Sequence, residues 1–397
     1  MVRVAWFANI DFQEGNAANS RIRAFAKGLK ANHAKVFLFF LSPTIFNSNG
    51  INKKSKGFYD GIYFNYLSGT CYRSQYLLIR FLRYVFAILN SSFLLIRKRN
   101  HFDVIFLYSP RLLFFGHIYL LGKILKIPVV IEKTELDQAA RPKKILHRFL
   151  SLFDKLEPYV LKYFCTHLIV ISDNLKKYYQ KYLPENKISK IPIIVDLTRF
   201  DVDHNPDKKF SVGYLGSFAE KDGINGLISS FKKALQIRPE LKLKLIGFNP
   251  NKKQLNLNLK SLQLNGAVQK SGQITYEQVP HWLGQCDLLV MNRTNDPYSH
   301  YGFPTKLGEY LATGIPTICT RVGDIESYLT DRENTVLVSP DNQDELTHAI
   351  LERYANYDVY KEIGIKGKQI AMEKFNFKTF VPVLYQILFK ATQKSGS

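Results

Sequence analysis

The stretch YGFPTKLGEYLATGIPTICT, residues 301–320, decides the fold class of this chain of 397 residues. Glycine and proline mark its first five residues as a loop, and residues 306–312 predict a short helix that a glycine ends, with a proline beyond. The run 317–320 predicts a strand, as does the apolar run 288–291 ahead of the loop. A strand, a helix and a second strand in this order are typical of a parallel sheet.

The same alternation of short apolar runs with helical patterns continues along the chain and predicts two parallel sheets. In the first half, strands are expected at residues 2–8, 35–41, 104–107, 128–131 and 168–171. In the second half, the further strands are expected at residues 210–215, 241–246, 268–271 and 335–338. The polar segment DVDHNPDKK, residues 201–209, predicts a linker between the halves, and residues 377–391 predict a closing amphipathic helix.

Basic residues are concentrated in the first half of a chain whose formal net charge is +22 at pH 7. Residues 1–200 hold 31 Lys and Arg against 12 Asp and Glu, whereas residues 201–397 hold 24 against 21. This imbalance predicts that an anionic partner meets the first half. The four cysteines have no paired spacing, which favours a reducing compartment and argues against a cysteine-based zinc site.

No targeting or membrane-spanning segment is expected. The start MVRVAWFANI lacks the apolar length and the small-residue cleavage site of a signal peptide. Residues 76–96 come nearest to a membrane span, but Arg80 and Arg83 lie within them. A central arginine costs about 2.5–3.5 kcal/mol on insertion scales, so we expect no transmembrane helix.

Two segments that follow predicted strands and open predicted helices are candidates for binding an anion. In residues 15–21, GNAANSR, small residues let backbone N–H groups approach an anion, and Arg21 adds a charge. In residues 213–223, GYLGSFAEKDG, Gly216 and Ser217 offer backbone donors and Lys221 offers a cation. An ordinary capped turn and a solvated loop are the respective alternatives.

The third and sharpest candidate lies in residues 301–316. The loop amides and Lys306 at the start of the helix form an anion site. Glu309 lies one turn further on the same face as Thr305, where its carboxylate can accept hydrogen bonds from a diol. A capped helix with a solvated Lys–Glu pair is the alternative.

Residues 302–316, together with Arg293 upstream and VGDI at residues 322–325, resemble the donor-site region of family 4 glycosyltransferases, the group 1 glycosyltransferases of the GT-B fold. Two further segments resemble the family in the same order, residues 191–200 and residues 271–287. The resemblance covers most of the chain and is specific in residues 210–340.

The resemblance implies an α/β chain of two facing Rossmann-like domains. Residues 1–203 are expected to bind the acceptor, with a C-terminal helix at about residues 377–397 crossing back to them, and residues 207–376 to bind the donor. The implied reaction is a retaining sugar transfer from a nucleotide sugar, without a cofactor or a divalent metal. The expected donor-binding residues are Gly15, Asn16, Arg21, Gly216, Ser217, Lys221, Phe303, Thr305, Lys306, Leu307 and Glu309, of which Glu309 matches the glutamate that binds the ribose.

Three positions depart from the family pattern. Tyr301 stands where the family has a glutamate eight residues ahead of Glu309. Ser217 replaces an arginine, and Asp222 replaces a lysine, with Lys221 displaced by one position. The identity of the transferred sugar therefore stays open.

The expected catalytic residues follow from these departures. Arg293 and Lys306, with help from Lys221, are expected to neutralise the diphosphate leaving group, because charge develops on it as the bond breaks. Glu135 follows a predicted strand of the first domain and is expected to orient or deprotonate an acceptor hydroxyl. A surface carboxylate is the alternative for Glu135.

Residues 72–99 and 141–164 interleave basic residues with aromatic and apolar ones. This pattern favours an anionic membrane surface, with ordinary core helices as the alternative. We therefore expect a cytoplasmic protein, peripheral on the inner face of the cell membrane, that adds a sugar to a lipid-linked or saccharide acceptor of a bacterial capsule or lipopolysaccharide. Nucleic acid is not expected, since no recognition module is visible. A nucleotide-sugar epimerase and a nucleic-acid-binding protein are the alternative functions.

Overall fold

The computed structural model describes residues 1–10, 17–43, 54–136, 145–201, 209–216, 218, 220–247, 264, 266–272 and 274–393. The chain divides into two compact units. The first comprises Met1–Gln13, Ile22–Pro192 and Lys378–Ser397, and the second comprises Glu14–Arg21 and Ile193–Phe377. The predicted linker lies largely outside the described residues, at 202–208.

The first unit is built on an eight-stranded sheet with the order β3-β4-β2-β1-β5-β6-β7-β8, parallel except for β3. The five predicted strands are confirmed, as β1 (Arg3–Ala8), β2 (Lys35–Phe40), β5 (Val104–Tyr108), β6 (Val129–Lys133) and β7 (His167–Val170). Three strands were not predicted, namely β3 (Lys56–Tyr59), β4 (Ile62–Tyr66) and β8 (Ile188–Lys190). They escape a search for apolar runs because β3 and β4 form a short edge hairpin and β8 has three residues.

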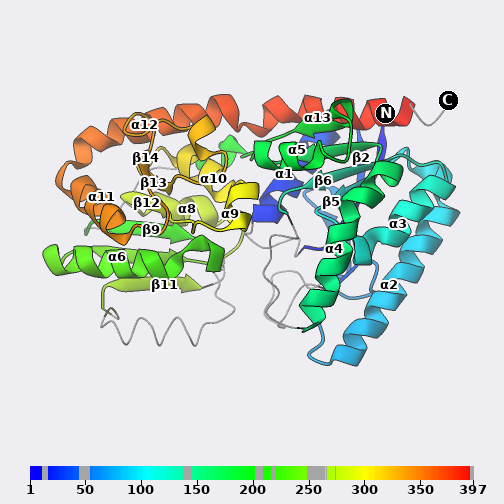
Figure 1. Ribbon diagram of the computed structural model, residues 1–397, viewed down its shortest axis with the longest axis horizontal. Coiled ribbons are helices and arrows are strands. Elements are labelled where there is room, and N and C mark those ends of the chain that lie inside the picture. The colour runs from blue at the N-terminus through cyan, green and yellow to red at the C-terminus, as the bar shows by residue number, and fades with distance from the viewer. Residues whose placement is uncertain are drawn as a thin grey trace. The chain divides into compact units, whose positions relative to one another are not determined.

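Helices flank this sheet (Figure 1). They are α1 (Ala17–Ala31), α2 (Leu77–Arg97), α3 (Leu112–Ile124), α4 (Ile145–Phe164), α5 (Asp173–Tyr179) and α13 (Phe377–Gln393). The predicted closing helix is thus present as α13, and from Lys378 onward it belongs to the first unit. It packs closely on α1, since a Cβ at Gly28 would collide with the side chain of Val381.

The second unit contains a six-stranded parallel sheet with the order β11-β10-β9-β12-β13-β14. All six strands were predicted, and they are observed as β9 (Ser211–Leu215), β10 (Lys242–Ile246), β11 (Val268–Gly272), β12 (Leu288–Met291), β13 (Thr317–Thr320) and β14 (Val336–Val338). Helices α6 (Ile224–Ile237), α8 (Val279–Gly284), α9 (Pro297–Tyr301), α10 (Thr305–Thr313), α11 (Gln343–Ala355) and α12 (Tyr357–Lys374) accompany it. The α/β fold class is confirmed.

Each sheet has a point at which the strand order reverses, between β1 and β5 in the first and between β9 and β12 in the second. In open α/β sheets, ligands bind outside the carboxyl ends of the strands at such a point. The predicted loop at residues 301–305 lies at this end of the second sheet, but it is shorter than expected. Tyr301 ends α9 and Thr305 begins α10, so only residues 302–304 separate the two helices.

Among the described segments, α2 is long and apolar enough to cross a membrane, judged by length and composition, and 17% of its most apolar window is buried. The expectation that residues 76–96 do not span a membrane therefore stays a prediction. The four cysteines, Cys71, Cys165, Cys286 and Cys319, are buried thiols that are not joined in disulfides.

Candidate functional site

The ammonium group of Lys306 is the centre of the candidate site in the second unit. Lys306 lies in the first turn of α10, and its Nζ donates to Asp222 Oδ2 at 3.0 Å and to the Tyr214 hydroxyl at 3.2 Å. Tyr214 belongs to β9, and Asp222 follows that strand in a short 3-10 helix, Glu220–Asp222. The loop after β9 and the start of α10 therefore meet at the carboxyl end of the second sheet.

The electrostatics of this pair follow from its burial. Burial lowers the pKa of Lys306, against the opposing effect of the Asp222 carboxylate. Burial would also raise the pKa of Asp222, but the charge and hydrogen bond of Lys306, with smaller effects from Arg293 and Lys221, hold that pKa below its ordinary value. The charges of all three predicted cations therefore lower the pKa of one carboxyl group, that of Asp222. These cations are Lys306, Arg293 and Lys221.

Arg293 reaches this point from the carboxyl end of β12 and is buried. Its backbone N–H donates to Thr320 Oγ1 at 2.9 Å, which anchors it to the neighbouring strand β13. A Cβ at Gly302 would stand 3.7 Å from both terminal nitrogens of the guanidinium, so this group lies against the loop between α9 and α10. Arg293 is thus held beside the start of α10, where the sequence predicts an anion site.

Gly216 lies against the ammonium group of Lys306. It follows β9, and its N–H donates to the carbonyl of Ile246 at 2.9 Å. A Cβ at this position would collide with Lys306 Nζ and with the Tyr214 hydroxyl. A residue without a side chain is therefore required for Lys306 to approach the backbone after β9.

Glu309 lies one turn beyond Lys306 on α10 and is buried. Its Oε1 lies 3.3 Å from Nη1 of Arg199 and accepts a hydrogen bond from Ser20 Oγ at 3.1 Å. The Arg199 guanidinium also lies 3.3 Å from the centre of the Tyr276 ring and donates to the Tyr276 carbonyl. Two side chains, Ser20 and Arg199, therefore contact the carboxylate directly, and Tyr276 positions the guanidinium of Arg199.

Sequence reasoning missed Arg199, Tyr276 and Ser20. Arg199 lies in the 3-10 helix Leu197–Phe200, inside the segment 191–200 that resembles the family, so a signal for it was present. Tyr276 likewise lies in the matching segment 271–287. Ser20 lies in the GNAANSR segment, in which the predicted anion contacts came from the backbone of the small residues and from Arg21.

The remaining predicted residues of the second unit lie in different environments. Thr305 is buried at the start of α10, which has no side-chain cap. The Phe303 ring stacks on Tyr328 at 5.3 Å, and the Leu307 side chain is fully buried, so both side chains serve packing. Arg21 is buried in α1. Gly15, Asn16 and Ser217 lie outside the described residues.

In the first unit, Glu135 is half-buried just beyond β6. Beside it, Ser109 Oγ and Thr134 Oγ1 share a hydrogen bond of 2.6 Å at the carboxyl ends of β5 and β6. Ser109 has a φ of 41°, a left-handed conformation that is uncommon for serine and is often found at functional sites. Glu135 therefore lies at the edge of the first sheet where a ligand is expected.

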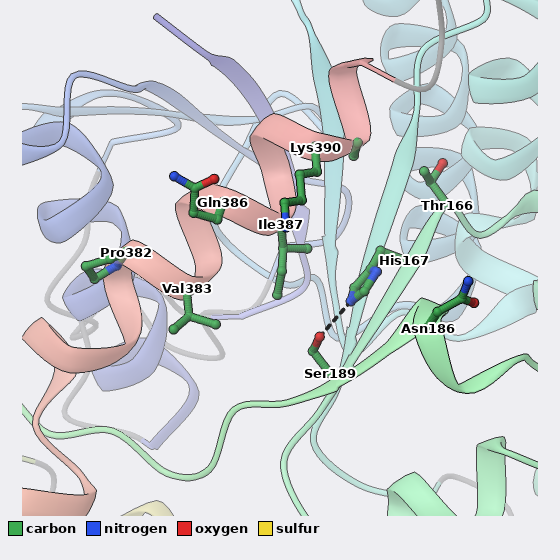
Figure 2. Close-up of a pocket in the computed structure, with 10 residues that line it drawn as sticks. Thr166, His167, Asn186, Ser189, Pro382, Val383, Gln386, Ile387 and Lys390 are labelled. Atoms are coloured by element: carbon green, nitrogen blue, oxygen red, sulfur yellow. Dashed lines mark hydrogen bonds between the residues drawn. The ribbon is translucent and has the colours of Figure 1, made fainter. Parts of the chain in front are cut away.

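Two cavities differ in their relation to the sheets. One of about 220 Å³ in the second unit is lined by residues that follow β12 and β14 and by the start of α6, which places it at the carboxyl edge. The other, in the first unit, encloses about 530 Å³ between α13 and the amino ends of β7 and β8, where His167 Nε2 and Ser189 Oγ lie 2.9 Å apart (Figure 2). Because ligands bind at the carboxyl ends of the strands in such sheets, we place no reacting group in the cavity between α13 and the amino ends of β7 and β8.

Known proteins resemble this chain in sequence. Residues 197–370 match the family profile described as "Glycosyl transferases group 1". The "Uncharacterized glycosyltransferase MJ1178" of Methanocaldococcus jannaschii is 25% identical over 224 residues, which are 55% of this chain and 60% of that protein. The "Putative teichuronic acid biosynthesis glycosyltransferase TuaC" of Bacillus subtilis is 29% identical over 185 residues, 44% of this chain and 43% of that protein. The match thus spans three-fifths or less of these relatives.

Solved structures resemble the chain over nearly its full length. Sucrose-phosphate synthase from Thermosynechococcus elongatus superposes with a TM-score of 0.77 at 17% identity, covering 98% of this chain and 100% of that one. Anabaena Alr3699/HepE, solved in complex with UDP and glucose, superposes with a TM-score of 0.75 at 14% identity, again covering 98% and 100%. At these identities the likeness shows a shared fold.

Proposed function

Because this chain is a group 1 glycosyltransferase with the GT-B fold, we propose that it transfers a sugar, with retention of configuration, from a nucleotide-sugar donor to a saccharide acceptor. The observation that carries this proposal is that Lys306 and Glu309 lie one turn apart on the same helix, α10, at the carboxyl edge of the second sheet. One helix thereby offers a cation for the diphosphate and a carboxylate for the ribose.

The cations around Asp222 supply the chemistry for the departing nucleotide. Breaking the bond between the sugar and the diphosphate develops negative charge on the phosphate oxygen. Lys306, Arg293 and Lys221 all act on the Asp222 carboxylate in this structure, so a diphosphate placed beside Lys306 meets three positive charges. In this proposal these side chains, and no divalent metal, stabilise the leaving group.

Glu309 supplies the second half of donor recognition. A carboxylate can accept two hydrogen bonds from the neighbouring hydroxyls of a ribose. The contacts of Arg199 and Ser20 with Oε1 fix the carboxylate before the nucleotide arrives, which lowers the entropy lost on binding. The HepE structure, which contains UDP, supports a uridine nucleotide as the first donor to examine.

We propose that the first unit binds the acceptor, with Glu135 as the group that orients or deprotonates its hydroxyl. The hydrogen-bonded pair Ser109 and Thr134 stands beside Glu135 and offers polar contacts to a saccharide. The likeness to TuaC, whose name refers to teichuronic acid biosynthesis, supports a bacterial surface polysaccharide such as a capsule or lipopolysaccharide as the product.

The basic first half supports a lipid-linked acceptor and a location at the cytoplasmic face of the cell membrane. Residues 1–200 carry 31 Lys and Arg against 12 Asp and Glu. Large apolar side chains of α2 and α4, among them Phe81, Phe86 and Leu152, are exposed. An exposed apolar helix with basic neighbours suits the surface of an anionic bilayer.

The decisive experiment is a panel of nucleotide sugars screened first for thermal stabilisation of the protein and then for turnover. We expect one uridine or guanosine diphosphate sugar to stabilise the protein, and a saccharide acceptor to accelerate its consumption. NMR of the product should show the anomeric configuration of the donor. Conversion of the donor without any acceptor would instead indicate an epimerase, and an inverted product would overturn the retaining assignment.

A further inference from the structure

A groove of about 550 Å³ in the first unit lies apart from the strand ends that hold the proposed acceptor site. Its floor is one face of the neighbouring strands β2, β4 and β3, and its walls come from the end of α2 and the short 3-10 helix Arg99–His101 that follows. Residues from the start of β2 and from the β3–β4 turn line it, so it opens toward the amino edge of the sheet.

The floor of the groove is aromatic. The Phe37 ring lies 6.2 Å from Tyr63 and 5.7 Å from Phe102, and Phe58 lies 5.5 Å from Tyr63, measured between ring centres. Strand pairing places Phe37, Tyr63 and Phe58 directly opposite one another, hence on one face of the sheet. Phe58 is 73% exposed. A sheet face on which aromatic rings stay partly exposed is a candidate binding surface for an apolar chain.

The rim of the groove is basic. Lys30, Lys35, Lys98 and His101 contribute to its lining, and none of the described lining residues is acidic. The carboxylates nearest in sequence are engaged elsewhere, since Asp60 pairs with Arg23 at 2.5 Å and Asp103 pairs with Arg3 at 2.5 Å. The groove therefore combines an apolar floor with a positive rim, which complements an amphiphile with an anionic head.

The groove adjoins the C-terminal end of α2, a helix that also carries an exposed apolar stripe. Leu82, Phe86, Leu89, Phe93 and Ile96 are exposed along this helix, while Leu94 and Lys98 at its end line the groove. At about 3.6 residues per turn, Leu94 and Lys98 lie on a different side of α2 from this stripe, so the helix carries two separate surfaces, the stripe and a wall of the groove.

Helix α2 contains three charged residues, and one of them, Arg97, contacts the stripe, with its guanidinium carbon 5.6 Å from the centre of the Phe93 ring. Arg80 Nε donates to the Ser74 carbonyl at 2.6 Å, and Arg83 Nη1 donates to the Tyr72 carbonyl at 2.7 Å. Both guanidinium groups are thereby engaged by the loop that precedes the helix. A bilayer that meets the stripe thus meets an apolar surface with a basic residue, Arg97, at its C-terminal end.

We propose that this groove binds an acyl chain of an anionic phospholipid, with the phosphate of the headgroup at Lys35 and Lys98. The proposal rests on the proposed membrane location and is independent of sugar transfer. A second copy of this chain is disfavoured as the occupant, because it would bring two basic rims together. A lipid drawn into the groove anchors the first unit through both its tail and its headgroup.

The test uses the full-length chain and dioctanoylphosphatidylglycerol as a dispersed monomer, with binding followed by calorimetry and native mass spectrometry. We expect saturable binding of this lipid, weaker binding of dioctanoylphosphatidylcholine and no measurable binding of inorganic phosphate. Phosphate binding equal to that of the lipid would overturn the proposal, because the apolar floor would then contribute nothing. Failure of both lipids to bind would overturn it as well.

Charge reversal at the rim separates the groove from general attraction to a basic protein. The double variant Lys35→Glu with Lys98→Glu is expected to weaken binding of the anionic lipid at least about tenfold. The control Lys123→Glu with Lys126→Glu makes the same change of charge at another groove of the same unit and should leave binding within about twofold. An equal loss in both double variants would show that only net charge matters.

Two single variants distinguish lipid binding in the groove from vesicle binding through α2. Phe58→Ser, at an exposed position that tolerates a polar residue, is expected to lose binding of the short-chain lipid. Phe93→Ser, on the α2 stripe, should keep that binding and lose affinity for vesicles. Thermal stabilisation by UDP shows that both variants are folded. If UDP did not stabilise the unmodified protein, that result would count against the proposed donor site and not against the lipid groove.

Discussion

Lys306 Nζ and Asp222 Oδ2 lie 3.0 Å apart and form a largely buried ion pair at the carboxyl edge of the second sheet. Asp222 occupies the position where the group 1 resemblance places a lysine. The three expected cations therefore surround a carboxylate, since Arg293 and Lys221 are close enough to influence both Lys306 and Asp222. The ion pair balances the charge of Lys306 and holds its ammonium group at the carboxyl edge of the sheet.

Asp222→Asn should destabilise the protein, because it leaves the Lys306 ammonium buried without its counter-charge. We expect a loss of about 3 kcal/mol in the free energy of unfolding, measured by urea denaturation. Saturating UDP should restore part of the loss, since its phosphates replace the missing charge. Asp344→Asn, which breaks the exposed pair with Lys233, is the matched control and should change stability little. Equal effects of the two substitutions would contradict this account.

Lys306→Ala should lower turnover more than donor affinity, because its charge is needed most when the leaving group departs. We expect kcat to fall by about 100-fold, with a smaller change in the dissociation constant of the donor. Steady-state kinetics combined with calorimetry measure the two effects separately. Lys233→Ala provides an exposed-lysine control. Unchanged kinetics in Lys306→Ala would remove this residue from the catalytic site.

Glu309→Ala should weaken nucleotide binding through the ribose. The loss of hydrogen bonds to a carboxylate predicts a decrease in affinity of about tenfold to 100-fold, for uridine as well as for UDP. Arg199→Ala should show a smaller decrease of the same kind, because it frees the carboxylate and the Tyr276 ring without removing either. If pyrophosphate lost as much affinity as uridine, the assignment of Glu309 to the ribose would be wrong.

Association with liposomes should depend on both salt and apolar contact. We expect sedimentation with anionic vesicles to fall as salt rises, since each basic residue near the surface contributes about 1 kcal/mol that salt screens. Phe86→Ser on α2 should reduce the part that survives at high salt, because Phe86 is exposed. Leu113→Ser, at an exposed position of α3, tests whether the effect is confined to α2. Absence of any lipid dependence would remove the membrane from the proposal.

His117 should make the first unit sensitive to acid. Its Nε2 lies 2.8 Å from Ser91 Oγ, between α3 and α2, and burial lowers its pKa to about 4. From the ordinary value near 6.5 down to about 4, the unfolded chain binds a proton that the folded chain does not. The free energy of unfolding should therefore fall as the pH falls through this window.

His117→Gln should remove this loss, which amounts to at most about 3 kcal/mol. Urea denaturation at a series of pH values measures it. His348→Gln, at an exposed position of α11, is the control and should leave the acid dependence unchanged. If His117→Gln destabilised the protein equally at pH 7 and pH 4.5, the effect would reflect packing and not protonation.

Local patterns in the sequence predicted the strands that are buried on both faces. The run 104–107 predicted β5 because each of its side chains is apolar, and all of β5 is buried. The hairpin of β3 and β4 gave no such signal, since half of its residues face outward and their pattern also fits a loop. Its turn depends on Asp60 and Gly61, both at positive φ, a conformation that an Asp-Gly pair favours.

The sequence by itself determined the fold class and the identity of the helix that carries Lys306 and Glu309, because the spacing of apolar residues, glycine and proline acts over a few residues. Only the tertiary structure decided which distant side chains complete the site. Asp222 meets Lys306 because the order of β9, β12 and β13 in the sheet brings the loop after β9 and the start of α10 to one edge. Arg199 precedes β9 in the chain and reaches Glu309 from the 3-10 helix Leu197–Phe200. The strand order depends on the packing of the whole sheet, which no single segment of the sequence records.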